Sequence, residues 1–251
     1  MTDAALDFSV EGMTLPPRKP RSPFGIGGSE IALAMLSFGN GDATTAPRWM
    51  RERAAMSKRH GVPFWIAEKV GLTAKKQDDT MRRGIAREPE LLSAFIERLE
   101  EDRWQHEAER DIDPSTIQWF GALPSEWPPF KDRTSPLAVR PDAWARTWAG
   151  ALVAISLKCA RYGFAKPAWW NGITEVPWYY AMQQHGEHAV CRFTKSLVVV
   201  GCGWNRDDDD PRSDGPILVL PVQRDEEREE TARSVARRAW ALVESRLVSR
   251  A

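Results

Sequence analysis

The sequence contains few cysteines and few histidines. Its 251 residues include three cysteines and four histidines. The cysteines, Cys159, Cys191 and Cys202, form no CxxC pair and no spaced ligand set with the histidines. These absences exclude a disulfide framework and a zinc site as the basis of the fold.

The sequence also lacks a long apolar segment and an excess of charge of either sign. No apolar run approaches the roughly 18 residues of a membrane span, and residues 1–12 do not have the pattern of a signal peptide. We therefore expect an intracellular protein that does not contact membranes. Because basic and acidic residues number 35 each, any nucleic-acid binding must depend on local segregation of charge.

The remaining composition suits a globular protein with one sizeable core. Hydrophobic residues make up 42 % and charged residues 28 % of the chain, which is ordinary for a soluble domain. Residues 1–24 differ, because four prolines there surround Arg18, Lys19 and Arg21. We expect residues 1–24 to be an extended arm, either a disordered tail or a basic arm that reaches a phosphate backbone. Residues 25–251 are expected to form a single domain.

A glycine-rich segment precedes the first expected helix. Residues 25–30 read GIGGSE, and an apolar run follows over residues 31–36. The pattern predicts a helix with Ser29 as its N-cap. The free N–H groups of such a helix start can bind an anion, although an ordinary cap has the same pattern.

Helical patterns continue through the first half of the chain. Residues 48–60 are a basic helix candidate, and Pro63 begins a further segment over residues 65–70 that Gly71 ends. Helical spacing then extends from residue 80 to residue 99, with Glu88 and Pro89 inside it. Because proline removes one helical hydrogen bond, we expect a helix boundary at Arg87 or Glu88, where a carboxylate can face a cleft.

The second half combines strands and helices. Residues 117–120, 137–139 and 152–157 are strand candidates, and residues 196–200 and 217–222 predict a hairpin. Residues 176–184 predict a helix with Pro177 in its first turn and with Tyr180 and Gln183 on one face. Asp225 opens a closing helix, whose expected apolar stripe consists of Ala232, Val235, Ala239, Leu242 and Leu247.

Residues 140–160, RPDAWARTWAGALVAISLKCA, are the most informative part of the chain. Asp142 precedes a predicted turn, and Lys158 ends the apolar run that follows. Paired strands lie about 5 Å apart, so a hairpin can bring this carboxylate and this ammonium together. Aspartate oxygens suit Mg²⁺, and a neighbouring lysine can act on water or on a developing phosphate charge. The same pattern also fits an aspartate in a turn and a lysine exposed to solvent, with no metal site.

These pieces together carry a resemblance. The chain resembles the lambda-exonuclease-like (YqaJ-type) viral recombinase nucleases of the PD-(D/E)xK superfamily over residues 21–243. The matching motifs are GGSE at residues 27–30, RGxxxEP at 83–89, PD at 141–142, LKC at 157–159 and PWYYAMQ at 177–183. The resemblance implies an α/β (α+β) fold with a central mixed β-sheet flanked by helices, the restriction-endonuclease-like core.

The implied function is a Mg²⁺-dependent exonuclease, with Mn²⁺ as a substitute, that degrades one strand of linear duplex DNA from the 5′ end in phage-type recombination. The implied partners are double-stranded DNA ends, a single-strand-annealing protein and further copies of the chain in a ring-shaped trimer. The implied location is the cytoplasm of a bacterial host, as a phage or prophage protein.

The resemblance also assigns roles to individual residues. Asp142 and the Leu157 carbonyl look like metal ligands, Lys158 is similar to the lysine that positions or activates water, Glu88 to an accessory acid and Gln183 to a glutamine near that water. The residues that resemble a 5′-phosphate pocket are Ser29, Arg21 and Arg140, the last in place of a small polar residue.

Two positions depart from the family pattern. The second metal carboxylate falls on Ser156, and the second glutamine of a QxQ pair falls on His185. A hydroxyl in place of a carboxylate lowers the affinity for a dication. Three explanations stay open: a weak enzyme, replacement by another acid such as Glu175 or Glu30, or an inactivating substitution. The alternative function is accordingly a DNA-end-binding protein that cleaves weakly or not at all.

Overall fold

The computed structural model describes residues 25–73, 79–104, 106–120, 130–160, 176–204 and 216–248. Its centre is a five-stranded mixed sheet with the strand order β3-β6-β7-β8-β9. The strands are β3 (Ile112–Trp119), β6 (Ala143–Thr147), β7 (Leu152–Ala160), β8 (Lys195–Cys202) and β9 (Ile217–Gln223). Strands β7 and β8 are parallel, and the other neighbours are antiparallel. This confirms the predicted mixed sheet.

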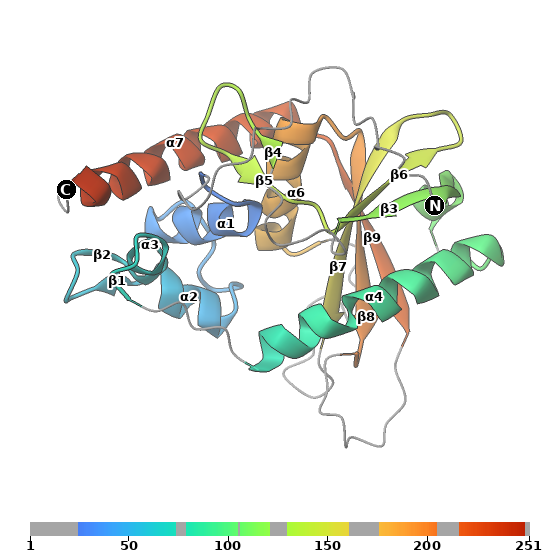
Figure 1. The fold of residues 1–251 in the computed structure, drawn as a ribbon, viewed down its shortest axis with the longest axis horizontal. Helices are drawn as coiled ribbons and strands as arrows, with labels where there is room; N and C mark the ends of the chain where they lie inside the picture. Colours follow the sequence, from blue (N-terminus) through green and yellow to red (C-terminus); the bar gives the residue numbers. More distant parts are fainter. Residues whose placement is uncertain are drawn as a thin grey trace, which may run out of the picture.

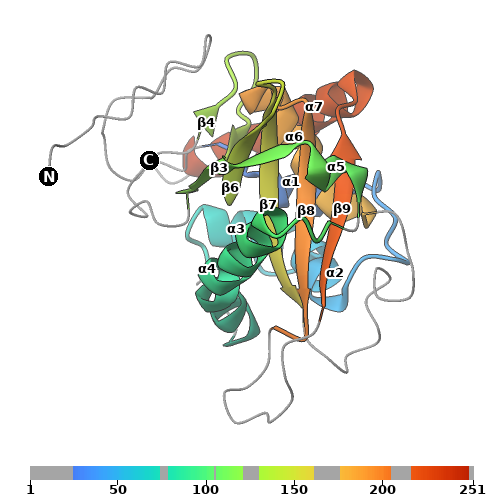
Figure 2. The ribbon, with the colours of Figure 1, turned by 90° about the vertical axis from the view of Figure 1, so that its right-hand side faces the viewer.

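Helices cover both faces of the sheet. The helices of the described residues are α1 (Gly28–Ser37), α2 (Arg48–Ala54), α3 (Phe64–Lys69), α4 (Asp79–Glu100), α5 (Glu107–Arg110), α6 (Trp178–Cys191) and α7 (Glu226–Val248). Helix α4 lies on one face, and α6 lies on the other with α1 and α7 (Figures 1 and 2). Two short hairpins accompany them, β1 (Met56–Ser57) with β2 (Val62–Pro63) and β4 (Phe130–Lys131) with β5 (Ala138–Val139). No helix in the described ranges is both long and apolar enough to cross a bilayer.

The alternation of side chains along β7 explains the two layers. Val153, Ile155 and Leu157 belong to the core cluster that contains the apolar residues of α4. Ala154 belongs to the cluster that contains residues of α1, α6 and α7. Because residues two apart on a strand share a face, Ser156 and Lys158 point with Ala154 toward the α6 layer.

Helix α4 is continuous through Pro89, so the boundary expected at Arg87 or Glu88 is wrong. Proline removes the hydrogen bond to the carbonyl four residues earlier, that of Ile85. Ile85 is 51 % exposed, so water can replace the missing donor. The fully buried Leu91 and Phe95 then hold the following turns against the sheet.

Two other expected helix ends and one expected apolar stripe also differ. The basic helix ends at Ala54 instead of residue 60, because the chain turns into the β1–β2 hairpin at Gly61, whose φ of +64° favours glycine. Helix α6 continues beyond residue 184 to Cys191. In α7, Val243 is fully buried and Leu247 is 36 % exposed, so the apolar stripe passes through Val243 instead of reaching Leu247.

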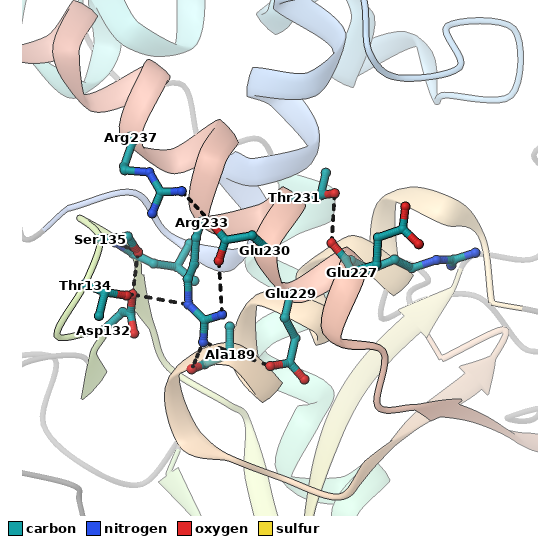
Figure 3. A network of polar contacts seen from close by, with 12 residues as sticks. Asp132, Thr134, Ser135, Ala189, Glu227, Glu229, Glu230, Thr231, Arg233 and Arg237 are labelled. Atoms are coloured by element: carbon teal, nitrogen blue, oxygen red, sulfur yellow. Dashed lines mark hydrogen bonds and ion pairs between the residues drawn. The ribbon is translucent and has the colours of Figure 1, made fainter.

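An ionic cluster on α7 holds the segment that leads into β6. Arg233 lies 3.5 Å from Asp132 and donates to the Ala189 carbonyl at 2.9 Å (Figure 3). Asp132 follows β4, and its carboxylate accepts hydrogen bonds from Thr134 and Ser135 in the same hairpin. The cluster thus connects α7, α6 and the β4–β5 hairpin, from which the chain runs directly to Asp142.

His188, one of two buried histidines of α6, predicts a stability that depends on pH. His188 is fully buried, its Nε2 lies 2.6 Å from Ser196 Oγ, and burial lowers its pKa to about 3. In the unfolded chain, the histidine side chain binds a proton near pH 6.5. The contribution of neutral His188 to stability is therefore fully present above that pH and is lost as the pH falls toward the folded pKa.

We expect the wild type to lose on the order of 2 kcal/mol more than His188→Gln between about pH 7.5 and about pH 5, since each pH unit contributes about 1.4 kcal/mol. Urea unfolding of both proteins at the two pH values measures this difference. Equal losses in the two proteins would contradict the assignment to His188.

Candidate active site

The β6–β7 hairpin brings Asp142 beside Ser156. Ala143 at the start of β6 is paired with Ile155 of β7, so the preceding residue, Asp142, lies next to residue 156. Asp142 Oδ2 accepts hydrogen bonds from the Leu157 N–H at 2.8 Å and from Ser156 Oγ at 3.2 Å. The side chain of Asp142 is therefore held in one orientation by the neighbouring strand.

The ammonium of Lys158 lies among the same oxygens. Its Nζ is 2.7 Å from Ser156 Oγ, 3.0 Å from the Leu157 carbonyl and 3.4 Å from Asp142 Oδ2. The hydrogen bond between Lys158 and Ser156 confirms that these two residues share one face of β7. Three oxygens on two adjacent strands thus converge on one positive charge.

The surroundings of Lys158 keep it protonated. Burial acts to lower its pKa, but the negative charges around it, led by that of Asp142, outweigh burial and raise the pKa above its ordinary value. The ring of Tyr180 on α6 lies 5.6 Å from Nζ, within the range of a cation–π contact. Lys158 is therefore a hydrogen-bond donor and a positive charge at neutral pH, and it is not a proton acceptor.

Glu88 approaches the site from α4. Burial and, to a lesser extent, the charge of Asp142 raise its pKa to about 7, against the opposing charge of Lys158. Glu88 therefore lies in the same electrostatic environment as Asp142 and Lys158, although it stands on a continuous helix instead of the expected break. Its carboxyl group exchanges its proton near neutral pH.

Helix α6 contributes Gln183 and a second acid. Gln183 Nε2 donates to Glu187 Oε1 at 3.1 Å. Glu187 is 1 % exposed, and burial followed by the charge of Asp142 raises its pKa to about 8. Sequence reasoning missed Glu187, because the expected helix stopped at residue 184. Its position four residues after Gln183, on the same helical face, was the available signal.

The residues proposed for a 5′-phosphate pocket are only partly described. Arg21 lies outside the described residues. Ser29 is exposed in the first turn of α1 and is not the N-cap, which is Gly27. The Gly27 N–H donates to Glu30 Oε2 at 2.7 Å, so the carboxylate of Glu30 caps the helix instead. Arg140 is exposed, two residues after Ala138, whose N–H donates to the Ile26 carbonyl before α1. The segments of Ser29 and Arg140 are therefore neighbours.

The structure also limits which acid can replace Ser156. Both oxygens of Glu30 are hydrogen-bonded to Lys69, at 2.7 and 3.0 Å, which removes Glu30 as a candidate. Glu175 lies outside the described residues. His185 is buried beside Arg228 and Asp225 at the start of α7, not beside Asp142. Among the described residues, Glu88 and Glu187 are acids whose charges interact with Asp142.

The donor set at Asp142 fits a hard divalent cation. Across the described ranges, no three histidine, cysteine, aspartate or glutamate side chains form a preassembled metal cluster. Asp142 and the Leu157 carbonyl are nevertheless oxygen donors of the kind that Mg²⁺ prefers. Both already converge on the cationic Nζ of Lys158, so this part of β7 and its neighbour accommodates positive charge.

Comparison with protein-family models and with curated protein sequences gives no match. Among solved structures, the chain is similar to LHK-Exo in complex with dAMP, with 15 % identity, 90 % of each chain covered and a TM-score of 0.53. It is also similar to an alkaline exonuclease (LHK-Exo) from Laribacter hongkongensis, with 16 % identity, 91 % of this chain and 95 % of that chain covered, and a TM-score of 0.49. The first similarity establishes the fold and confirms the predicted lambda-exonuclease-like architecture.

Proposed function

We propose that this chain is a metal-dependent deoxyribonuclease that degrades one strand of linear duplex DNA from its 5′ end. The observation that carries the proposal is the convergence of Asp142, Ser156 and Lys158 on one face of the β6–β7 hairpin. Support also comes from the shared fold, because LHK-Exo is an alkaline exonuclease whose structure was solved with the deoxynucleotide dAMP.

Each side chain of the site has a role in phosphodiester hydrolysis. Asp142 and the Leu157 carbonyl would hold Mg²⁺ or Mn²⁺. A bound ion of this kind polarises a phosphoryl oxygen and lowers the pKa of a coordinated water. Lys158, which stays protonated, donates to a phosphate oxygen and stabilises the negative charge that develops there. Gln183 orients the attacking water, and Glu88 accepts its proton once that carboxyl group is ionised.

A degradation assay tests the proposal. The protein is incubated with 5′-phosphorylated linear duplex and with closed circular duplex, in Mg²⁺, in Mn²⁺ and in EDTA. We expect nucleotide release from the linear DNA alone, and only with metal. Labels at the 5′ and 3′ ends report the polarity. A mobility shift of linear DNA without any loss of nucleotides would instead support the alternative, a DNA-end-binding protein that Ser156 has made inactive.

The 5′-phosphate pocket carries a separate prediction. Ser29→Ala combined with Arg21→Ala removes two anion donors, so we expect the preference for 5′-phosphate over 5′-hydroxyl ends to fall by about tenfold, or roughly 1.4 kcal/mol. Initial rates on the two kinds of DNA end measure the preference. The matched control is Ser37→Ala, since Ser37 lies at the opposite end of α1. An unchanged preference in the double variant would leave Ser29 as an ordinary helix residue.

The assembly is also a proposal. By resemblance, the chain forms a ring-shaped trimer around DNA and works with a single-strand-annealing protein in recombination, in the cytoplasm of a bacterial host. Sedimentation equilibrium of the full chain is expected to give three times the monomer mass. A monomer at micromolar concentration would contradict the ring.

A further inference from the structure

One face of α6 lines the site. Tyr180, Gln183 and Glu187 are spaced three and four residues apart, so they lie along one side of the helix. Tyr180 contacts Lys158, as described above. The start of α1 packs against the other two residues: a Cβ atom on Gly28 would lie 3.1 Å from Gln183 Cγ and 3.8 Å from Glu187 Oε1. Glu187 is thus enclosed between α1 and α6, on the face that meets Lys158.

The folded chain alone leaves the carboxylate of Glu187 incompletely satisfied. Its Oε1 accepts from Gln183, but its Oε2 is buried and has no hydrogen-bond partner in the described part of the chain. Two other buried glutamates differ, because Glu109 is paired with Arg98 at 2.6 Å and Glu229 with Arg224 at 2.7 Å. A buried carboxylate without a cation is unfavourable. The Oε2 atom of Glu187 is therefore available to bind a ligand.

The charges around the site favour a divalent ligand. Asp142, Glu88 and Glu187 are three carboxyl groups that interact electrostatically with the single ammonium of Lys158. If all are ionised, three negative charges face one positive charge, and the excess of two matches one divalent cation. Ser156, fully buried and neutral, contributes none of this charge.

We propose that Glu187 supplies the second anionic ligand of the metal site, the role that Ser156 cannot fill. The proposal rests on the proposed function for the identity of the reaction, but it concerns metal binding by this chain. A carboxylate on α6 then replaces one on β7, and both strand-borne groups, Asp142 and the Leu157 carbonyl, remain in place. Ser156 is accordingly compatible with an active site.

Manganese binding without DNA tests the proposal. Free Mn²⁺ is measured by electron paramagnetic resonance during titration of the wild type, Glu187→Gln, Asp142→Asn and the control Glu229→Gln. Glu229 is also a buried glutamate, but it lies on α7 in the ion pair with Arg224. We expect Glu187→Gln and Asp142→Asn each to weaken Mn²⁺ binding by at least about tenfold, and Glu229→Gln to change it by less than about twofold. Wild-type affinity in Glu187→Gln would overturn the proposal.

A rescue experiment separates ligation from structural damage. Ser156→Glu in the Glu187→Gln background returns a carboxylate to the site from β7, and we expect it to recover at least about tenfold in Mn²⁺ affinity. The same substitution in the wild type is expected to have a smaller effect, because Glu187 already provides that charge. An equal gain in both backgrounds would show that Glu187 is not the ligand.

Thermal unfolding in EDTA at about pH 9 completes the test. The pKa of Glu187 is raised from 4.5 to about 8 in the fold, so the folded state loses stability as the pH rises between these two values, and the loss is complete at about pH 9. Glu187→Gln is therefore expected to unfold at the same temperature as the wild type or higher. A large decrease would assign Glu187 a structural role. The experiments separate failure of this inference from failure of the proposed function. If the wild type degrades DNA and Glu187→Gln binds Mn²⁺ with wild-type affinity, only the inference is refuted. If Glu187→Gln weakens Mn²⁺ binding as expected but the wild type does not degrade DNA, only the proposed function is refuted.

Discussion

Asp142→Asn and Lys158→Ala are each expected to reduce nucleotide release from linear duplex by at least about 10³-fold, or roughly 4 kcal/mol in the barrier. Asparagine retains the shape of Asp142, and its oxygen can still accept from the Leu157 N–H, but it removes the charge that a dication requires. Alanine at 158 removes the donor that faces the phosphate. Binding to DNA ends is expected to persist in both variants, because backbone phosphate contacts position the duplex separately from the chemistry.

A second lysine–aspartate pair in the same sheet provides matched controls. Lys195 of β8 is 2.9 Å from Asp111 and is paired with Val153, five residues before Lys158 on β7, roughly 16 Å along the strand. Asp111→Asn and Lys195→Ala are expected to keep near wild-type rates. Initial rates with end-labelled duplex and mobility shifts in EDTA are the measurements. Full cleavage by Asp142→Asn or Lys158→Ala would place the active site elsewhere.

Arg98→Met is expected to destabilise the fold by about 3 to 5 kcal/mol, the range for breaking a buried ion pair. Arg98 of α4 donates to Glu109 at 2.8 Å and to the Ile217 carbonyl at 2.8 Å. Both side chains of the ion pair are buried. Methionine fills much of the volume but leaves the charge of Glu109 and the carbonyl of Ile217 without this partner. Helix α4, which carries Glu88, would then lose its connection to α5 and β9.

Denaturant unfolding followed by circular dichroism measures this loss. The matched control is Arg48→Met, because Arg48 forms an exposed ion pair with Glu52 at 2.7 Å, and an exposed pair contributes at most about 1 kcal/mol. If Arg98→Met and Arg48→Met change the free energy of unfolding by similar amounts, the buried pair has no special role in the fold.

The sequence by itself was sufficient to predict the hairpin that carries the candidate site. A Pro-Asp pair in front of a predicted turn, followed by an apolar β-type run that ends in lysine, indicates two neighbouring strands, and the strand period of two places residues 156 and 158 on one face. The contact between Asp142 and Lys158 followed from the same local geometry. These contacts involve residues within one short segment, so pattern and spacing are enough to find them.

Sequence patterns predicted helix ends less reliably where a tertiary contact outweighs a local preference. Pro89 breaks helical bonding in principle, yet α4 continues because its following turns are buried against the sheet. Ser29 has the character of an N-cap, but Glu30 caps α1 from within the helix, supported by Lys69 on α3. Lys69 is 39 residues away from Glu30, and no local pattern reports such a partner.

The environment of Glu187 was decided by tertiary structure alone. In the sequence, this residue is one of 35 acidic residues, and only its spacing of four residues from Gln183 relates it to the candidate site. The connection between β7 and β8 places α6 over the sheet face that carries Ser156 and Lys158, and the start of α1 then encloses Glu187. The burial of Glu187, its interaction with Asp142 and the lack of a partner for its Oε2 within the described part of the chain arise from the packing of segments far apart in the sequence. Periodicity specifies which face of an element is buried, and it does not specify which charges that face meets.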